Sequence, residues 1–385
     1  KDVTWYRLNN NVANEFYAVD HIDEANRVWH TDVNGLQYFD PVMQQFAKHS
    51  FKDLSGPDWA FAFYILSDKT GNNITVCPRW TDGLYRFDRV NQKWSKFLFP
   101  PHASFKSEKD AIRGFVQLPT GDFIISADRG IFVYSEKMKT IKLLKDELPF
   151  SVTRRGEILL DHAQNLWIAQ EEVGLIKWKP GTRQYKMYEV REPSPDTVPV
   201  ITRMTNLFED SKGNIWFQKT GGFGIYVAAE DSVRKFLYSN NESSSFPVVY
   251  SFAEDRNGKV WVSGENGWIG YALSAEPEKG IVYKQNRRER GEPAYLPGLA
   301  TDARGNVWGY TARELFSINA DDLSFSTYSF SYGIDEVDYF HFSFLPSGEM
   351  VFGGRNDIII ADPDELKRNT EIPVPYIDEM EVLNQ

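Results

Sequence analysis

Tryptophan recurs along this chain at a nearly constant interval, each time just after a polar turn that starts at an aspartate and is rich in glycine and asparagine. The residues are Trp29, Trp167, Trp216, Trp261 and Trp308. The gaps from Trp167 onward are 49, 45 and 47 residues, and the first gap, 138, is three times 46. A fixed period of this length indicates a stack of one repeated unit, because no unit alone can bury its apolar face. We therefore expect function to reside on the shared surface of the repeats.

Aligning the sequence on this period predicts eight units. The clearest copy has the letters FEDSKGNIW at 208–216 and continues, after a polar loop, with GIY at 224–226. Three weaker copies lack the tryptophan. The anchor positions are 29, 76, 124, 167, 216, 261, 308 and 351.

Each unit contains four short expected strands, A to D in chain order. In the clearest copy they are residues 203–209, 215–217, 224–227 and 234–238. Runs of β-branched and aromatic residues split by Gly, Asn and Asp are typical of strands joined by tight turns. In the A–B turn the aspartate can accept hydrogen bonds from backbone N–H groups two residues on, and the tryptophan can bury about 200 Å² between sheets. The pattern predicts an all-β fold, a single β-propeller of four-stranded blades.

The last unit has expected strands A, B and C at 342–345, 349–352 and 357–361, but no clear strand D. Residues 2–8 belong to no unit and resemble the other expected D strands. We expect this run to complete the last blade and close the ring. The motif count gives eight blades, with seven as the alternative if one terminal unit packs outside the ring. The predicted domains are a propeller at 1–370 and an exit segment at 371–385.

Composition restricts the partners. The net charge is -11, and no basic cluster exceeds Arg287-Arg288-Glu289-Arg290, which argues against nucleic acid as a ligand. The one cysteine, Cys77, excludes an internal disulfide and a multi-cysteine metal site. No run approaches the roughly 18 apolar residues of a membrane span, so we expect no membrane contact. Without a signal-peptide pattern, the chain is expected to be cytosolic or else a processed or excised segment.

The repeat, in the form FEDxxGNIW…GIY and with the variant DGLYRFD at 82–88, resembles the two-component regulator propeller repeat. The stretch IPVPYIDEMEVLN at 372–384 is similar to the segment by which such propellers lead into a small β-sandwich domain. The resemblance implies the periplasmic sensor region of a hybrid two-component system (histidine kinase and response regulator), with an oligosaccharide as the ligand. It also implies that signalling activity belongs to the parent protein, with this piece non-catalytic.

The resemblance carries further expectations about partners. A neighbouring propeller or the β-sandwich domain of the same parent chain would contact this propeller, and a homodimer formed through the parent is one allowed state. Ligand binding would act by shifting the population between arrangements of propeller and neighbour.

No catalytic or cofactor motif stands out in the sequence. The six histidines are scattered through different units without the spacing of metal ligands, and there is no Gly-x-Ser-x-Gly elbow or phosphate-binding loop. The repeated aspartate turns lack the alternating acids and distal Glu of a calcium loop. We therefore expect no catalytic residues, metal or cofactor.

Propeller geometry indicates where a ligand would bind. With strand A lining the central channel, the D–A and B–C loops gather at one mouth of that channel, and the D–A loops vary most in length and chemistry. Aromatic faces suit sugar rings, and arginines suit acidic groups on a glycan. The candidate ligand-binding residues are Trp59, Trp80, Arg129, Arg155, Glu171, Trp268, Arg313 and Arg355. For each, inter-blade packing or pairing with a neighbouring acid is the competing explanation.

Two other functions stay open at this stage. One is a protein-interaction scaffold that docks a partner without a small ligand. The other is a carbohydrate-active enzyme, which would need two carboxylates or a Tyr/His pair converging in the channel. The nearest such group in the sequence is Asp338, Tyr339 and His341.

Overall fold

The structure, a computed structural model, describes most of the repeat region. The described residues are 18–22, 28–32, 35–39, 47–54, 60–102, 104–105, 110–144, 148, 150, 156–170, 174–189, 204–219, 222–237, 249–264, 267–286, 288–289, 292–293, 295–311, 314–329 and 341–366. In that part of the chain, no helix is both long enough and apolar enough to cross a membrane.

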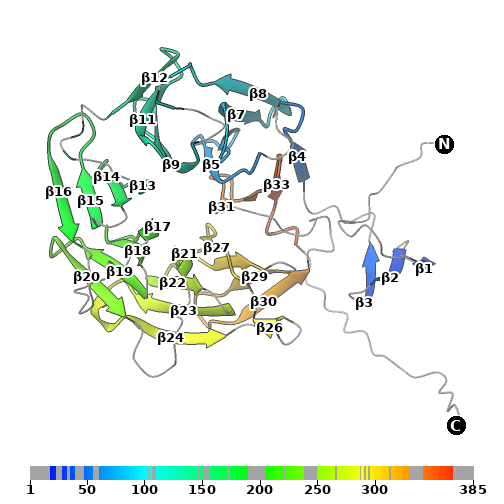
Figure 1. The fold of residues 1–385 in the computed structure, drawn as a ribbon. Coiled ribbons are helices and arrows are strands. Elements are labelled where there is room, and N and C mark those ends of the chain that lie inside the picture. The colour runs from blue at the N-terminus through cyan, green and yellow to red at the C-terminus, as the bar shows by residue number, and fades with distance from the viewer. Residues whose placement is uncertain are drawn as a thin grey trace, which may run out of the picture.

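Seven four-stranded antiparallel sheets are arranged in a ring (Figure 1). We number them as blades. Blade 1 is β5 (Tyr64–Ser67), β6 (Asn73–Cys77), β7 (Gly83–Asp88) and β8 (Lys93–Leu98). Blade 2 is β9 (Ile112–Gln117), β10 (Phe123–Ala127), β11 (Gly130–Ser135) and β12 (Thr140–Leu143). Blade 3 is β13 (Gly156–Leu160), β14 (Leu166–Gln170), β15 (Gly174–Trp178) and β16 (Tyr185–Glu189). Blade 4 is β17 (Met204–Glu209), β18 (Ile215–Lys219), β19 (Gly222–Val227) and β20 (Ser232–Leu237).

The remaining blades follow the same order. Blade 5 is β21 (Val249–Glu254), β22 (Lys259–Gly264), β23 (Trp268–Leu273) and β24 (Ile281–Asn286), with a 3₁₀ turn, η2 (Pro277–Lys279), before β24. Blade 6 is β27 (Gly298–Thr301), β28 (Val307–Tyr310), β29 (Glu314–Ile318) and β30 (Phe325–Ser329). Blade 7 is β31 (His341–Phe344), β32 (Met350–Gly353), β33 (Asp357–Ala361) and β4 (Ala47–Ser50). A two-stranded ribbon, β25 (Arg288–Glu289) and β26 (Glu292–Pro293), lies between blades 5 and 6 in sequence.

The predicted all-β propeller of four-stranded blades is confirmed, but the count of eight blades is wrong. The unit anchored at Trp29 forms a separate three-stranded sheet, β1 (Ala18–Ile22), β2 (Val28–Asp32) and β3 (Gly35–Phe39), to one side of the ring (Figure 1). Its following strand, β4, pairs with β33 of blade 7, with Ala47 opposite Ile360. Within residues 341–366, the described part of the last unit, no strand follows β33, and β4 supplies the backbone partners at its edge. The expected closing strand at 2–8 and the exit segment at 371–385 lie outside the described residues.

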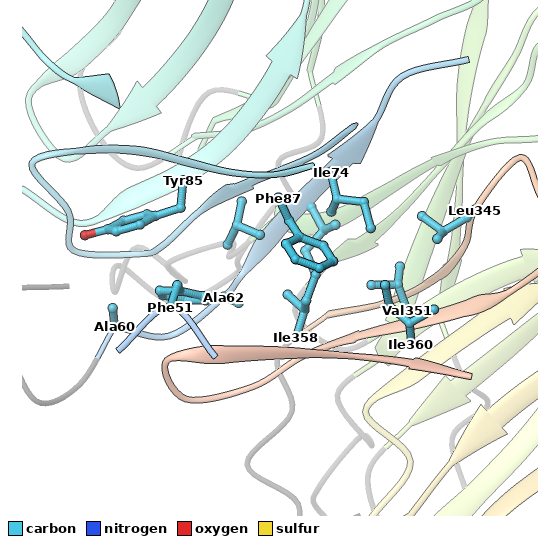
Figure 2. Packing of buried hydrophobic residues seen from close by; sticks show 12 residues of the cluster. Phe51, Ala60, Ala62, Ile74, Tyr85, Phe87, Leu345, Val351, Ile358 and Ile360 are labelled. Carbon is cyan, nitrogen blue, oxygen red and sulfur yellow. The ribbon is translucent and has the colours of Figure 1, made fainter. Parts of the chain in front are cut away.

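Aromatic and aliphatic side chains fill each seam between blades. In the described part of the chain there are seven hydrophobic clusters, and each joins one blade to the next. The cluster between blades 7 and 1 combines Ile74 and Phe87 of blade 1 with Leu345 and Ile358 of blade 7 (Figure 2). The last blade therefore packs against the first, and stability comes from contacts between neighbours, as in other repeat proteins.

One hydrogen-bond pattern explains the recurring spacing between the turn aspartate and the tryptophan. As predicted, the turn aspartate accepts a bond from the backbone N–H two residues on, for example from Lys212 to Asp210 at 3.0 Å. The same carboxylate also accepts the indole N–H of the tryptophan six residues on. The pairs are Asp161 with Trp167 (2.8 Å), Asp210 with Trp216 (2.8 Å), Asp255 with Trp261 (2.9 Å) and Asp302 with Trp308 (2.8 Å). Each aspartate thus fixes both the turn and the ring that packs in the seam.

Candidate functional site

The first strand of each blade lies nearest the ring axis (Figure 1). At one end of the channel, the loop that enters β5 is bonded to the turn after β32. The backbone N–H of Ala60 donates to Asn356 Oδ1 at 2.8 Å, and the N–H of Asn356 donates to the Ala60 carbonyl at 2.8 Å. A Cβ on Gly353 would lie 2.1 Å from the Ala62 carbonyl oxygen, so only glycine permits this approach. As predicted, a D–A loop and a B–C loop of neighbouring blades meet here.

Five side chains gather at this junction, and we call them the mouth cluster: Phe61, Phe63, Arg79, Trp80 and Arg355. The Arg79 guanidinium lies 4.9 Å from the centre of the Phe63 ring and 5.1 Å from that of Trp80. The exposed Arg355 lies 5.3 Å from the Phe61 ring, which is edge-on to Trp80 at 6.4 Å. Cations over ring faces are held by the ring quadrupole. The arrangement presents guanidinium and aromatic groups together on one partly exposed surface.

This chemistry suits a ligand with acidic groups and apolar ring faces. Guanidinium groups pair with carboxylate or sulfate oxygens in a bidentate manner, and indole or phenyl faces pack against the C–H side of a sugar ring. On the next blade the other arginines are already matched by acids. Arg129 Nε lies 2.9 Å from the buried Asp110, and Arg113 Nε lies 2.9 Å from Asp128.

Several first strands also carry polar residues. Tyr64 of β5 interacts electrostatically with Glu157 of β13, with Arg79 and with Arg113 of β9, and burial raises the pKa of Tyr64. His341, the first residue of β31, has its ring Nε2 2.9 Å from Ser343 Oγ. Burial lowers the pKa of His341 to about 4, so its ring is neutral near pH 7. Of the sequence-derived trio, Asp338 and Tyr339 lie outside the described residues.

Glu157 is held by an irregularity in the neighbouring strand. A bulge in β17 shifts the register between Thr205 and Phe208, and Asn206 adopts a φ of 54° there. Asparagine tolerates this left-handed conformation better than most residues. The bulge directs the N–H of Asn206 to the Glu157 carboxylate, and the Asn206 amide donates to the Val249 carbonyl at 2.9 Å. Burial nevertheless raises the pKa of Glu157 to about 7, against the lowering effect of the backbone N–H groups of Asn206 and Leu207.

The structure brings together two of the eight candidate residues, Trp80 and Arg355. Arg129 is paired with Asp110, as described above. Trp268 is 2% exposed and packs in the seam between blades 4 and 5, where a Cβ on Gly264 would lie 2.2 Å from its indole nitrogen. Its ring therefore fills a seam and offers no face at the mouth. Four candidates lie outside the described residues: Trp59, Arg155, Glu171 and Arg313.

Sequence reasoning missed Phe61 and Phe63 at the mouth, and Tyr64 and Glu157 in the channel. The run Phe61-Ala62-Phe63-Tyr64 directly before an expected first strand was the available signal for the aromatic part of the site. Nothing local indicated Glu157, because its environment depends on a bulge in the next blade.

Comparison with known proteins bears on the family and the fold. A profile of the two component regulator propeller matches residues 243–266, which span the turn and Trp261 of blade 5. This segment carries one copy of the two component regulator propeller repeat. No curated protein sequence matches the chain at a significant level.

Solved structures of the same fold have diverse sequences. Virginiamycin B lyase from Staphylococcus aureus is 10% identical, with a TM-score of 0.59 over 82% of this chain and 98% of that one. YCF48 from Cyanidioschyzon merolae is 11% identical, with a TM-score of 0.61 over 83% and 99%. PorZ of Porphyromonas gingivalis is 14% identical, with a TM-score of 0.58 over 88% of this chain and 51% of that one. At this identity the likeness concerns the fold alone, because one fold hosts unrelated functions.

Proposed function

We propose that this two component regulator propeller is a ligand-sensing, non-catalytic unit of a periplasmic signalling protein. Its ligand is an oligosaccharide that binds at the mouth cluster. The observation that carries the proposal is the gathering of two arginines and three aromatic rings where loops of blades 7 and 1 meet.

The charge distribution favours an acidic glycan. The chain carries a net charge of -11, so a general attraction for anions is excluded, and recognition would depend on the local arginines. Arg355 is exposed, and Trp80 beside it is partly exposed. A uronate or sulfate on the sugar would pair with the guanidinium group while the ring packs on the indole.

Signalling would follow from coupling to a neighbour in the parent protein, which we propose to be a histidine kinase with a second propeller or a β-sandwich domain beside this one. A ligand shifts the equilibrium between two arrangements of the propeller and its neighbour only as far as it binds one arrangement better than the other. The mouth is built from loops at the junction of two blades, so a bound glycan can contact both the ring and a domain docked on this face.

Arg355→Ala is expected to weaken binding of an acidic oligosaccharide about tenfold, the effect of losing one charge-assisted pair. Binding is measured by isothermal titration calorimetry of the whole chain against a panel of neutral, uronate-containing and sulfated oligosaccharides. The matched control is Arg183→Ala, which removes the same charge from an exposed C–D turn at the other end of blade 3.

Equal affinity in the Arg355 variant and the wild type would place the ligand elsewhere. Silence of the wild-type chain across the panel would overturn the proposal in favour of a protein-docking scaffold. Turnover of any glycan by the pure protein would show an enzyme instead.

A further inference from the structure

A cavity of about 500 Å³ opens at the end of the propeller opposite the mouth cluster, in the seam between blades 6 and 7. Its walls are the A–B turns at 302–306 and 347–349, the C–D turn residues 319, 324 and 362–364, and the outer strands of blade 6. Trp308, Ser317, Ser326 and Tyr328 line it from one face of the blade 6 sheet. We call it the seam pocket.

The repeat itself shows why the seam is open here. Trp308, Ser317 and Ser326 lie opposite one another on β28, β29 and β30. The same register in blade 3 places Lys177 opposite Trp167, and the Lys177 ammonium lies 5.2 Å from the indole centre. The lysine covers the indole in blade 3, whereas serine leaves the corresponding space in blade 6 unfilled.

Other blades fill this position in their own ways. In blade 5, Tyr271 packs on Trp261 with ring centres 5.0 Å apart. In blade 4, the buried Ile225 lies opposite Trp216. A serine at this position is therefore a local departure from the repeat that creates space beside an aromatic ring.

A second departure removes a bond that links other blades. The side chain of Glu254 in blade 5 accepts the backbone N–H and the hydroxyl of Ser211 in blade 4, at 2.6 and 2.8 Å. Between blades 6 and 7 the equivalent positions are Ala303 and Phe344, which cannot form a side-chain hydrogen bond. Phe344 packs edge-on to Trp308 instead, at 6.4 Å. Both departures occur in the same seam.

The pocket combines an aromatic pair with hydroxyl groups. Trp308 and Tyr328 are stacked with ring centres 5.4 Å apart and an interplanar angle of 23°. The hydroxyls of Ser317, Ser326 and Tyr328 have no hydrogen-bond partner within the described part of the chain, so they can donate to and accept from a ligand. Asn319 adds an amide group to the wall.

Charge in the pocket opposes an acidic ligand. Four acids line it, Asp302, Glu349, Asp362 and Asp364, against one lining arginine. Arg304 is paired with Asp364 at 2.5 Å, and Arg89 outside the pocket binds Glu349 at 2.6 Å. The positive charges are thus already matched by carboxylates, and an anion entering here would face like charge.

We propose that the seam pocket binds a neutral sugar unit, with hydroxyls bonded to Ser317, Ser326 and Tyr328 and a C–H face against the partly exposed ring of Tyr328, which the buried Trp308 supports from behind. The volume lies within the range of small-molecule sites. The site is separate from the mouth cluster in place and in charge, so the two take different ligands. The inference does not depend on the mouth binding a glycan.

Ser317→Lys is the deciding variant, because it restores the residue that covers the indole in blade 3. We expect the wild-type chain to bind neutral sugars with millimolar affinity and the Ser317→Lys variant not to bind them. Binding is detected by saturation-transfer NMR of the whole chain with glucose, galactose, mannose, xylose, maltose and cellobiose. Ser317→Ala, which leaves the space open, is expected to weaken binding about fivefold through the loss of one hydrogen bond. The control is Thr327→Lys, which places the same charge on the neighbouring strand β30, on the opposite face of the sheet.

The outcomes distinguish binding at the seam pocket from binding at the mouth cluster. No signal from the wild-type chain with any of these sugars would overturn the proposal, and so would a signal that persists in a folded Ser317→Lys variant. Binding lost in Arg355→Ala and kept in Ser317→Lys would assign the sugar to the mouth. Glucuronate that binds in a Ser317-dependent manner would contradict the neutral class.

Discussion

Replacing Asp210 with alanine is expected to lower the free energy of unfolding by about 3–5 kcal/mol, the cost of breaking a buried, fully hydrogen-bonded charge. Asp210 is 2% exposed. One oxygen accepts the Trp216 indole N–H at 2.8 Å, the Asn214 amide at 2.9 Å and the Ser274 hydroxyl at 2.8 Å. The other accepts backbone N–H groups of Lys212 and Asn214 at 3.0 and 2.9 Å. Alanine would leave the buried donors of Trp216 and Asn214 without an acceptor.

The measurement is urea unfolding of the whole chain, followed by tryptophan fluorescence and by circular dichroism. Asp322→Ala is the control, because the exposed Asp322 accepts only the backbone N–H of Ser324 in a surface turn and does not pack between blades. Asp210→Asn is the sharper variant: an amide keeps one acceptor, but its NH₂ group would face either the indole N–H or the backbone N–H groups of Lys212 and Asn214. If Asp210→Ala unfolded at the same urea concentration as the wild type, the aspartate–indole bond would not be a stabilising element of the repeat.

The architecture could be predicted from the sequence because the repeat encodes it locally. The period, the aspartate turns and the strand runs predicted the units that form blades 1 to 6 and the first three strands of blade 7, but not that β4 is the fourth strand of blade 7. The number of blades could not be fixed in the same way. The unit at Trp29 matches the repeat, yet its fourth strand, β4, pairs with β33, and that choice of partner is a property of the assembled ring.

Less of the candidate site could be predicted from the sequence. The loop positions of Trp80 and Arg355 followed from blade geometry, and the structure places both beside Phe61. Trp268 shares the loop position but is buried, because Gly264 opposite it leaves room for the ring. Trp268 is the first residue of β23, and the absence of a side chain on Gly264 of the adjacent strand β22 is what allows its ring to pack inward. The seam pocket likewise becomes visible only when the strand registers of different blades are compared.

We expect the unfolding free energy of the Glu157→Gln variant to gain on that of the wild type as the pH rises from 5 to 8. The difference between the two should grow by about 3 kcal/mol over this range. Burial raises the pKa of Glu157 from its ordinary 4.5 to about 7. Between those values the folded wild type holds a proton that the unfolded chain has lost, so its stability falls as the pH rises. Glutamine removes this titration and can still accept the N–H of Asn206, which the β17 bulge directs at position 157.

The quantity to measure is the difference in unfolding free energy between variant and wild type at several pH values. Taking the difference cancels groups common to both, including His341, whose lowered pKa acts in the opposite direction. Glu230→Gln is the control for sign. Hydrogen bonding by Arg234 lowers the pKa of Glu230, so the wild type loses that contribution as the pH falls, and the difference should move only at acidic pH. A Glu157→Gln difference that stays constant from pH 5 to 8 would mean that the carboxylate is ionised throughout. The channel would then solvate Glu157 well enough to keep its charge, and the β17 bulge would stabilise an anion in place of a neutral acid.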